Sequence, residues 1–384
     1  MTGLAATGTS PALVPTTTRS AADIEAWLRL TGARGLGTGA LRRLLATFGL
    51  PHQLLAQAVS ALAAVIPEKH ARALLAPPDA VTMALVERTV AWAAEPGNHV
   101  VTLADAAYPR ALLDLSDPPL VLYVKGQLGA LGGPAIAMVG ARSATVQGAE
   151  DARRFARVLS GAGLAVVSGL ALGIDGAAHE GALEGALEGA GGTVAVIGTG
   201  ADLVYPARHR DLAHRIAAHG AIVSEFALGM PGRSHHFPQR NRIIAALARG
   251  VLVVEAAARS GSLITARLAA EIGREVYAIP GSIHAPLSKG CHLLIRQGAK
   301  LVETAQDVLE ELGMAGDAAR PVAPAPMPAL DDVLGLTLTH DPVTLDALCA
   351  RTALPPEQVV ASLLTLELAG AVERLPGNVY RRVS

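Results

Sequence analysis

Two polar turns joined by an apolar run occupy residues 234–266, the stretch of this sequence best suited to hold an anion. The first turn contains Arg240, Asn241 and Arg242 at a predicted helix start, where the helix dipole favours negative charge. The apolar run at residues 251–254 predicts a buried strand. A buried strand between two such turns would place both at the ligand-binding edge of an open α/β sheet.

The second turn consists of small residues, Gly261 and Ser262, before a predicted helix that contains Thr265. Small residues at a helix start let backbone N–H groups approach an anion closely. Phe237, one of four phenylalanines in the chain, precedes the arginines. An aromatic face beside phosphate-neutralising charge can stack a nucleic-acid base, and a buried core position is the alternative for Phe237.

Another small-residue turn follows the apolar run at residues 135–139 and contains Gly140, Arg142, Ser143 and Thr145. Its N–H groups and the planar Arg142 guanidinium suit a phosphate. The spacing is not the GxGxxG of dinucleotide enzymes, and no acidic residue follows at the position expected for a ribose contact. The turn therefore predicts phosphate contact without NAD, and an ordinary strand-to-helix turn with a surface arginine is the alternative.

Ser168 and Gly169 end a further apolar run and are predicted to join the same anion-binding site. Asp175 and His179 follow at the i,i+4 spacing of a helix. Such a pair could transfer protons in catalysis. A histidine with a neighbouring carboxylate on a helix is more often structural, and the structural interpretation is favoured here.

Lys289 precedes a short predicted helix and would add a second cationic turn at the same sheet edge. The neighbouring His284, Cys291 and His292 lack the compact spacing of zinc ligands, so no metal site is predicted.

Several catalytic motifs are absent from the sequence, namely the P-loop GxxxxGK[ST], the GxSxG elbow and HExxH. Glu225 and Glu255 follow predicted strands, but two carboxylates without further acids do not make a two-metal nuclease. We therefore expect a binding protein with no catalytic residues and no cofactor.

The elements that position these turns are short apolar runs alternating with helical segments from about residue 98. Continuous rather than alternating apolar runs are typical of strands buried on both faces of a parallel sheet. The pattern predicts a Rossmann-like, doubly wound, mostly parallel α/β domain over residues 97–312.

Inside this domain the repeat EGALEGALEGAG at residues 180–191 places Glu180, Glu184 and Glu188 on one helix face. Like charges at this spacing are mildly destabilising, so the repeat is interpreted as an extra turn on an exposed helix end.

Smaller segments flank the α/β domain. Residues 1–20 are rich in Thr, Ser, Pro and Ala and predict a disordered tail, and residues 21–96 predict a helical domain resembling a helix-hairpin-helix or sterile-alpha-motif bundle. Residues 313–328 form a Pro/Ala linker, and residues 329–384 follow a winged-helix pattern. The predicted recognition helix at residues 356–369 has no Lys or Arg, which favours a structural or protein-contact role over DNA reading.

Composition limits the function classes. The net charge of −1 excludes a uniformly basic nucleic-acid coat but allows a local basic cleft. The two cysteines lie far apart, as in proteins of a reducing compartment. The N-terminal residues lack a secretory pattern, and no apolar run is long enough to span a membrane, so a cytoplasmic protein without membrane contact is expected.

The motifs that carry a family resemblance are, in order, VGARSAT, SGLALGIDGAAH, GTGADLVYP, SEF, FPQRNRIIAAL, VEAAARSGSLITA, REVYAIPG and KGCHLLIRQGAKLV. In order and spacing they resemble the DNA-processing protein A family (DprA, also called Smf) over about residues 98–312.

The resemblance implies a homodimer formed through the Rossmann-like domain that binds single-stranded DNA in a basic pocket. It also implies that the protein protects incoming DNA and promotes loading of the RecA recombinase during natural transformation. Carried over by position, Arg142 and Ser143 would contact phosphate in the first loop and Phe237 would lie near a base. Two further groups would complete the pocket: Arg240, Asn241 and Arg242 as a basic helix start, and Gly261, Ser262 and Thr265 as its lining.

Two other functions are compatible with the same core. A nucleotide phosphoribohydrolase of the lysine-decarboxylase-like (LOG) type, or a nucleotide-binding sensor, would share the Rossmann-like fold. LOG-type enzymes carry PGGxGTxEE where this chain has EAAARSGSLITA, and the missing pair of glutamates argues against hydrolysis. A scaffold that acts only through its terminal domains is the third possibility.

Overall fold

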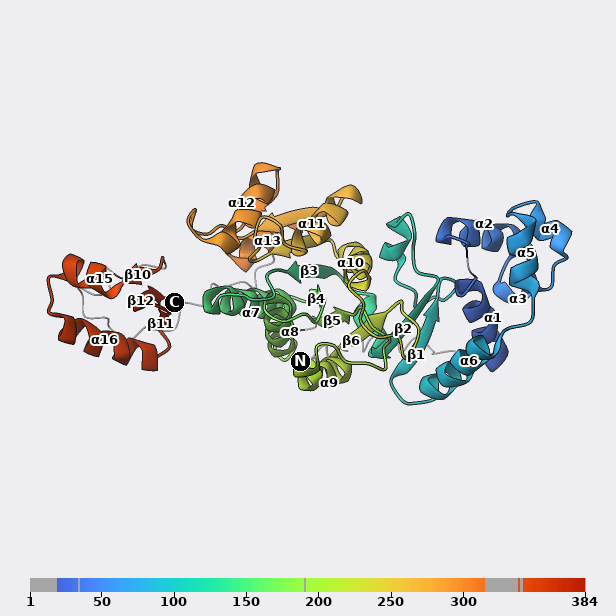
Figure 1. The fold of residues 1–384 in the computed structure, drawn as a ribbon, viewed down its shortest axis with the longest axis horizontal. Helices are drawn as coiled ribbons and strands as arrows, with labels where there is room; N and C mark the ends of the chain where they lie inside the picture. The colour runs from blue at the N-terminus through green and yellow to red at the C-terminus, as the bar shows by residue number, and fades with distance from the viewer. Residues whose placement is uncertain (1–18, 34, 190, 315–337, 339–340, 384) are drawn as a thin grey trace, which may run out of the picture.

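The structure is a computed structural model that describes residues 19–33, 35–189, 191–314, 338 and 341–383. Helices at the N-terminal end, a central α/β domain and a small C-terminal unit follow one another along the longest axis (Figure 1). Most of the predicted disordered tail (1–20) and of the predicted linker (313–328) falls outside the described residues, so both predictions stay untested.

The N-terminal segment is helical, as the sequence predicts. Its helices are α1 (Ala21–Thr31), α2 (Thr38–Phe48), α3 (Pro51–Leu55), α4 (Val59–Ala63), α5 (Glu68–Leu75) and α6 (Ala80–Ala93). Ser20 caps α1 by accepting the Asp23 N–H. Trp92 of α6 packs edge-to-face on Tyr123, with ring centroids 5.9 Å apart, so these helices share a core with the edge of the central sheet. The likeness to a sterile-alpha-motif or helix-hairpin-helix bundle stays a prediction.

The central sheet has the strand order β1-β2-β6-β5-β4-β3-β7-β8-β9. From β6 to β9 every neighbouring pair is parallel, and β1 and β2 form an antiparallel edge. The strands are β1 (Asn98–Thr102), β2 (Val121–Gly126), β3 (Ala135–Val139), β4 (Ala165–Ser168), β5 (Gly192–Val196), β6 (Ala221–Ser224), β7 (Gly250–Val253), β8 (Glu275–Ala278) and β9 (Lys300–Leu301). The predicted mostly parallel, Rossmann-like fold is confirmed.

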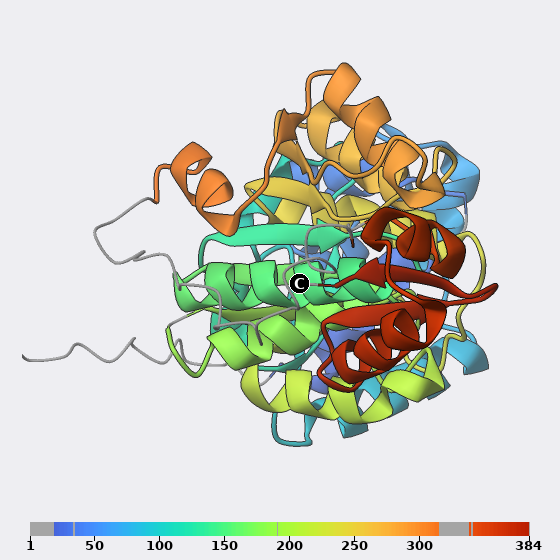
Figure 2. The ribbon, with the colours of Figure 1, turned by 90° about the vertical axis from the view of Figure 1, so that its left-hand side faces the viewer.

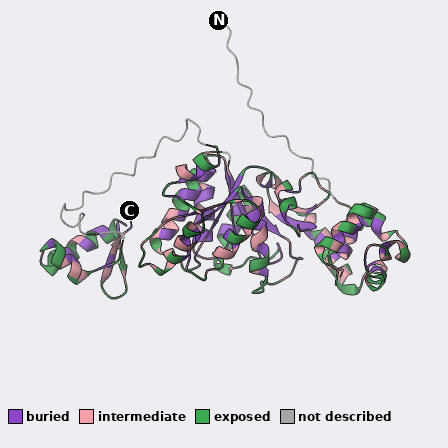
Figure 3. Cartoon of the chain, turned by 90° about the horizontal axis from the view of Figure 1, so that it is seen from above, coloured by how far each residue is buried: buried purple, intermediate pink, exposed green. Residues whose placement is uncertain are grey.

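Both faces of this sheet are covered. Along β3, Ala135, Ala137 and Val139 face one apolar cluster, and Ile136 and Met138 face another, as the two-residue period of a strand requires. Every residue of β3 to β7 is buried, which explains the continuous apolar runs in the sequence (Figure 3).

Helices and short 3-10 turns connect the strands. The helices are α7 (Val146–Gly161), α8 (Ile174–Gly185), α9 (Arg210–His219), α10 (His236–Leu247), α11 (Ser262–Glu271), α12 (Lys289–Arg296) and α13 (Ala305–Glu311). The 3-10 turns are η1 (Arg110–Asp114), η2 (Leu128–Leu131), η3 (Ala207–His209) and η4 (Pro286–Ser288). The chain runs from β3 through β4 and β5 to β6 on one side and from β7 through β8 to β9 on the other, so the strand order reverses between β3 and β7.

The glutamate repeat lies at the C-terminal end of α8 and has an exposed end and a packed glycine face. Its glycines lie against α7: a Cβ at Gly181 would be 2.0 Å from the Arg153 carbonyl oxygen, and one at Gly185 would be 2.1 Å from that of Arg157. Only glycine lets the two helices approach so closely.

The glutamates of the repeat are paired with arginines of neighbouring helices. Glu184 accepts a hydrogen bond from Arg153 at 2.9 Å, and Glu188 accepts one from Arg157 at 3.0 Å. The predicted exposed end is present, since Leu187 is 87% exposed just after α8 ends at Gly185. The glycine face of the repeat is instead packed against α7, and arginines lie opposite its glutamates.

The C-terminal unit has its own small core and a three-stranded antiparallel sheet in the order β10-β12-β11. Its elements are β10 (Val343–Thr344), α15 (Leu345–Thr352), α16 (Pro356–Leu368), β11 (Val372–Leu375) and β12 (Val379–Arg382). The order of α15, α16 and the antiparallel β11–β12 hairpin confirms the predicted winged-helix pattern (Figure 2). Across the described residues, no helix combines the length and apolar character needed to cross a membrane.

Candidate functional site

A cavity of about 400 Å³ opens at the carboxyl ends of β3 and β7. This is the point where the strand order reverses, which is where open α/β sheets bind their ligands. The cavity is lined by Val139, Gly140, Arg142, Ala171, Asp175, Phe237, Pro238, Arg240, Asn241, Ile244, Ser260, Gly261, Ser262, Ile264 and Thr265. Loops that are far apart in the sequence therefore meet at one place.

Eight of the predicted site residues line this cavity: Gly140, Arg142, Phe237, Arg240, Asn241, Gly261, Ser262 and Thr265. Six others, Ser143, Thr145, Ser168, Gly169, Arg242 and Lys289, are not part of its lining. The two turns of residues 234–266 do converge on one edge of the sheet, as the sequence predicts.

Arg142 and Phe237 form the aromatic and cationic part of the cavity. The Arg142 Cζ atom lies 5.6 Å from the centroid of the Phe237 ring, within the range of a cation–π contact. Arg142 is exposed and Phe237 is half-buried, so a ligand can reach both. Phe237 is therefore not a fully buried core residue, which was the alternative for this position.

Tyr205 is not among the predicted site residues, yet its ring centroid lies 5.6 Å from that of Phe237. Tyr205 is 55% exposed and extends the aromatic surface beyond the cavity. The sequence does contain a signal for Tyr205, because tyrosine is rare in this chain, with five in all, and Tyr205 stands in the GTGADLVYP motif.

Arg240 is almost completely enclosed, with 4% of its surface exposed. Its Nη1 atom donates to the Val196 carbonyl oxygen at 2.9 Å. A Cβ at Gly169 would lie 1.6 Å from that nitrogen, so Gly169 is the residue that leaves room for the guanidinium. Burial lowers the pKa of Arg240 to about 10, which leaves it charged at neutral pH, and the negative charge of Asp175 opposes this lowering.

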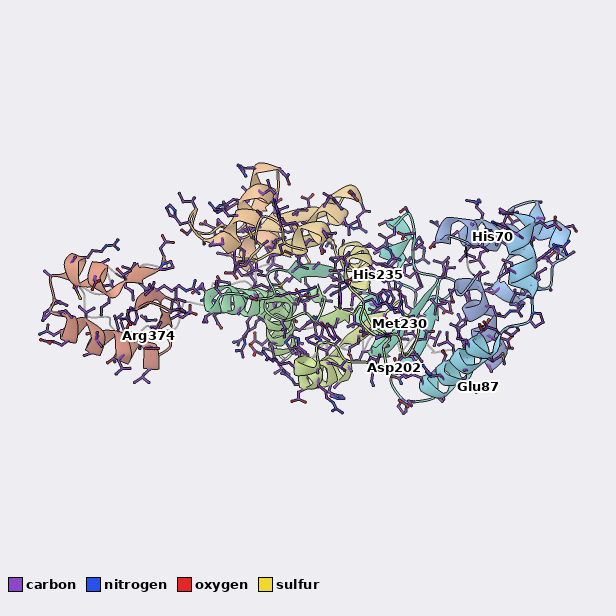
Figure 4. All side chains as sticks on the ribbon, viewed as in Figure 1. His70, Glu87, Asp202, Met230, His235 and Arg374 are labelled. Atoms are coloured by element: carbon purple, nitrogen blue, oxygen red, sulfur yellow. The ribbon has the colours of Figure 1, made fainter. Side chains whose placement is uncertain are left out.

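The predicted helix start at Arg240 is wrong. Helix α10 begins at His236, one turn earlier, just after His235 (Figure 4), so Phe237 rather than Arg240 lies in the first turn. The dipole argument therefore does not apply to Arg240, and its charge acts from the second turn of the helix.

Asp175 is 7% exposed, and its Oδ2 atom accepts the Gly169 N–H at 3.1 Å and the Ala171 N–H at 3.3 Å. Burial raises its pKa, against the pull of Arg240 and of these two N–H groups. His179 lies on the same helix outside the cavity lining, with its Nδ1 atom 2.7 Å from the Thr193 hydroxyl. Burial lowers the pKa of His179 to about 3, so it is neutral and structural, and the acid–base interpretation of this pair gains no support.

Helix α11 points its N-terminus at the cavity. Its N-cap residue, Gly261, has no side chain that could cap the helix, and a Cβ there would meet no atom within 4 Å. The hydroxyl groups of Ser260 and Ser262 lie 2.6 Å apart beside it. The helix end thus presents backbone N–H groups and hydroxyls, but no carboxylate, to an anion.

Arg242 does not act as a cavity cation. It makes ion pairs with Glu225 at 2.6 Å and with Asp117 at 3.1 Å, and its side chain is only 12% exposed. Two carboxylates already pair with its charge, so the expected role of Arg242 in the basic helix start of the pocket is corrected to a structural ion pair.

Three of the four predicted residues not yet described have local hydrogen-bond partners. Ser168 is buried and donates to the Met138 carbonyl oxygen at 2.6 Å, and Lys289 donates to the Ile283 carbonyl oxygen away from the cavity lining. Thr145 caps α7, and Ser143 is exposed on the same turn. The structure does not bring these four to the cavity, although Gly140 and Arg142 of the β3–α7 turn do reach it.

Among the residues whose placement is described, no group of three or more His, Cys, Asp or Glu side chains could hold a metal ion. The expectations of no metal and no cofactor stay predictions.

The family model described as DNA recombination-mediator protein A matches residues 99–313, more than half of the chain. The chain belongs to this family. A second model, described as the DprA winged helix domain, matches residues 317–378. The resemblance stated from the motifs is thereby confirmed.

Relatives agree with this membership. The chain is 42% identical to protein Smf of Escherichia coli over 77% of this chain and 80% of that protein, and 48% identical to DNA processing protein DprA of Streptococcus pneumoniae over 55% and 73%. Solved structures include DprA of S. pneumoniae, with a TM-score of 0.65 and 38% identity over 75% of this chain and 97% of that one.

A second solved structure, of DNA processing protein A from Helicobacter pylori, has a TM-score of 0.50 and 30% identity. It covers 56% of this chain and 95% of that one, and it is described as giving insight into the single-stranded DNA binding mode of that protein.

Proposed function

We propose that this protein binds single-stranded DNA in the cavity between β3 and β7. The observation that carries the proposal is the convergence, on one cavity, of the Arg142–Phe237 pair, the buried Arg240 charge and the α11 N-terminus. Cations and helix N–H groups bind phosphate, and an aromatic face stacks a base of any sequence. The single-stranded DNA binding described for the H. pylori relative supports the same role.

Binding of this kind depends on salt and only weakly on sequence, because phosphate neutralisation releases counterions. The test is fluorescence anisotropy with labelled oligothymidine over a series of salt concentrations. Wild type should bind, and Arg142→Ala should bind more weakly and with a shallower salt dependence. Arg154→Ala is the matched control, since Arg154 is exposed on α7 and pairs with Asp151. An Arg142→Ala variant that keeps wild-type affinity and salt slope would show that the site is wrongly placed.

We also propose that the protein binds DNA without catalysing a reaction. Asp175 is the acidic residue in the cavity lining, and two backbone N–H groups hold its carboxylate. A LOG-type hydrolase would need paired glutamates that EAAARSGSLITA does not supply. Incubation with AMP and chromatography for free adenine tests this, and release of adenine at enzymatic rates would contradict a purely binding function.

We further propose that the protein is a cytoplasmic homodimer, joined through its α/β domain, that protects incoming DNA and promotes RecA loading in natural transformation. Family membership and the DNA-processing names of the relatives support this extension. Light scattering after gel filtration tests the dimer. RecA filament assembly on single strands coated with single-strand-binding protein, with and without this protein, tests loading.

A further inference from the structure

Three strand-to-helix turns adjoin the cavity: β3–α7, β4–α8 and β7–α11. In parallel α/β sheets such turns expose backbone N–H groups at the start of each helix and commonly hold phosphates. In this protein the three turns are not equivalent, because two of them already hold a carboxylate of the protein itself.

The first of these carboxylates is Glu255, which follows β7 and reaches the N-terminus of α7. Its Oε2 atom accepts the Thr145 N–H at 3.0 Å, and its Oε1 atom accepts the Thr145 hydroxyl at 2.5 Å. A Cβ at Gly148 would lie 2.2 Å from the Glu255 carboxyl carbon, so a glycine in the first turn of α7 makes space for this group. The position that a phosphate takes in dinucleotide-binding folds is thus filled.

The second carboxylate is Asp175, in the first turn of α8. It accepts the N–H groups of Gly169 and Ala171 in the β4–α8 turn and is almost fully buried. A phosphate at this turn would have to displace it.

The third turn, at α11, differs from the other two. The N–H of Ser262 is bonded to the Ser260 hydroxyl at 3.3 Å, and that of Leu263 to the Ser260 carbonyl oxygen at 3.2 Å. Both acceptors are neutral, so the positive end of the helix dipole is not compensated there. Arg142 and Arg240 line the same cavity.

We propose that the Glu255 and Asp175 carboxylates occupy the anion positions of two of the three turns, in place of phosphates. They leave the cavity one phosphate position, at α11, and exclude ligands with two adjacent phosphates. The inference rests on the proposed function and deepens it. Neighbouring phosphates of a DNA strand are separated by a sugar, so a strand needs only one position here. A nucleoside diphosphate or a dinucleotide joins its phosphates directly and would bring the second one towards turns whose N–H groups already bond to the Asp175 and Glu255 carboxylates.

The test compares AMP with ADP by equilibrium dialysis, without DNA, for wild type, Glu255→Ala and Glu255→Gln. Wild type should bind ADP no better than AMP. Glu255→Ala empties the α7 turn, and its ratio of ADP to AMP affinity should rise by at least about tenfold, since N–H groups bond strongly to charged acceptors. Glu255→Gln removes the charge but keeps the turn filled, so its ratio should rise less.

Two results would overturn the inference. One is a ratio of ADP affinity to AMP affinity that Glu255→Ala leaves unchanged, and the other is a wild-type protein that already prefers ADP as strongly as that variant does. If Glu255→Ala does not fold, as judged by circular dichroism, Glu255→Gln and Asp175→Asn decide by the same ratio. A collapse of the Arg142 loop would weaken AMP and ADP binding together, so it cannot by itself produce the expected rise in the ratio. Oligothymidine binding by wild type is measured separately, so failure of the proposed function is distinguishable from failure of this inference.

Discussion

Replacing Phe237 by alanine should weaken oligothymidine binding by about 1–3 kcal/mol, or roughly 5–150-fold, the range for one base stacked on an aromatic side chain. The ring is half-buried, lines the cavity and lies 5.6 Å from both the Arg142 guanidinium carbon and the Tyr205 centroid. Tyr205 supports the ring from outside the cavity. The assay is fluorescence anisotropy at several salt concentrations.

The salt dependence of oligothymidine binding should distinguish the roles of Arg142 and Phe237, the two partners of the cation–π pair. Loss of Arg142 removes a phosphate contact and should reduce the slope of log affinity against log salt by about 0.7, whereas loss of Phe237 should leave the slope unchanged. The ring also holds the exposed guanidinium in place. The double variant should therefore cost less than the sum of the single variants by about 0.5–1 kcal/mol.

Phe237→Leu is the matched control, because leucine keeps the apolar side chain and removes the aromatic face. It should bind nearly as weakly as Phe237→Ala if stacking is the source of affinity. Wild-type binding by Phe237→Leu, or a slope change with Phe237→Ala and none with Arg142→Ala, would refute this assignment of roles.

Other perturbations test the structural conclusions. Gly181→Ala should lower the free energy of unfolding, measured by urea titration, by about 1–3 kcal/mol, since its Cβ would meet a backbone oxygen of α7. The control is Gly39→Ala in α2, where the Cβ would meet no close neighbour, so this variant should be neutral or stabilising. Arg242→Ala should lower the free energy of unfolding by about 3 kcal/mol, because it leaves Glu225 buried without its partner. The same variant should keep the wild-type salt slope of oligothymidine binding, and a reduced slope would show that Arg242 contacts phosphate. His179 has a folded-state pKa of about 3, below its usual 6.5, so below pH 6.5 the unfolded chain binds a proton that the folded chain does not. Stability should thus fall as pH drops from 6.5 towards 3, by about 2 kcal/mol at pH 5, and His179→Gln should flatten this part of the curve measured by thermal unfolding.

The sheet was largely predictable because its signal is local. Each buried parallel strand is a short apolar run, and β3 and β7 were both recognised in this way. The small-residue turns after them were equally visible. Since parallel strands carry their carboxyl ends to one edge, their convergence followed from the fold class.

The repeat at residues 180–191 carries two periodic signals, and only the glutamate signal entered the prediction of an exposed helix end. Glutamate recurs at every fourth position, but so does glycine, and glycines spaced by four residues leave a flat helix face for close packing. The like charges are tolerated because Arg153 and Arg157 have the same spacing on α7 and lie opposite Glu184 and Glu188.

By itself the sequence determined the alternation of strands and helices, the polar turns at the strand ends, and the presence of Arg240 and Arg242 beside Phe237. Only the tertiary structure decided what each arginine does. The two are separated by about 200° around α10, since each residue turns the helix by about 100°. One guanidinium therefore enters the cavity beside Gly169, and the other meets Glu225 and Asp117, which come from distant segments. Which of the two cations lines the cavity depends on the partners that folding brings to each, and those partners are not neighbours in the sequence.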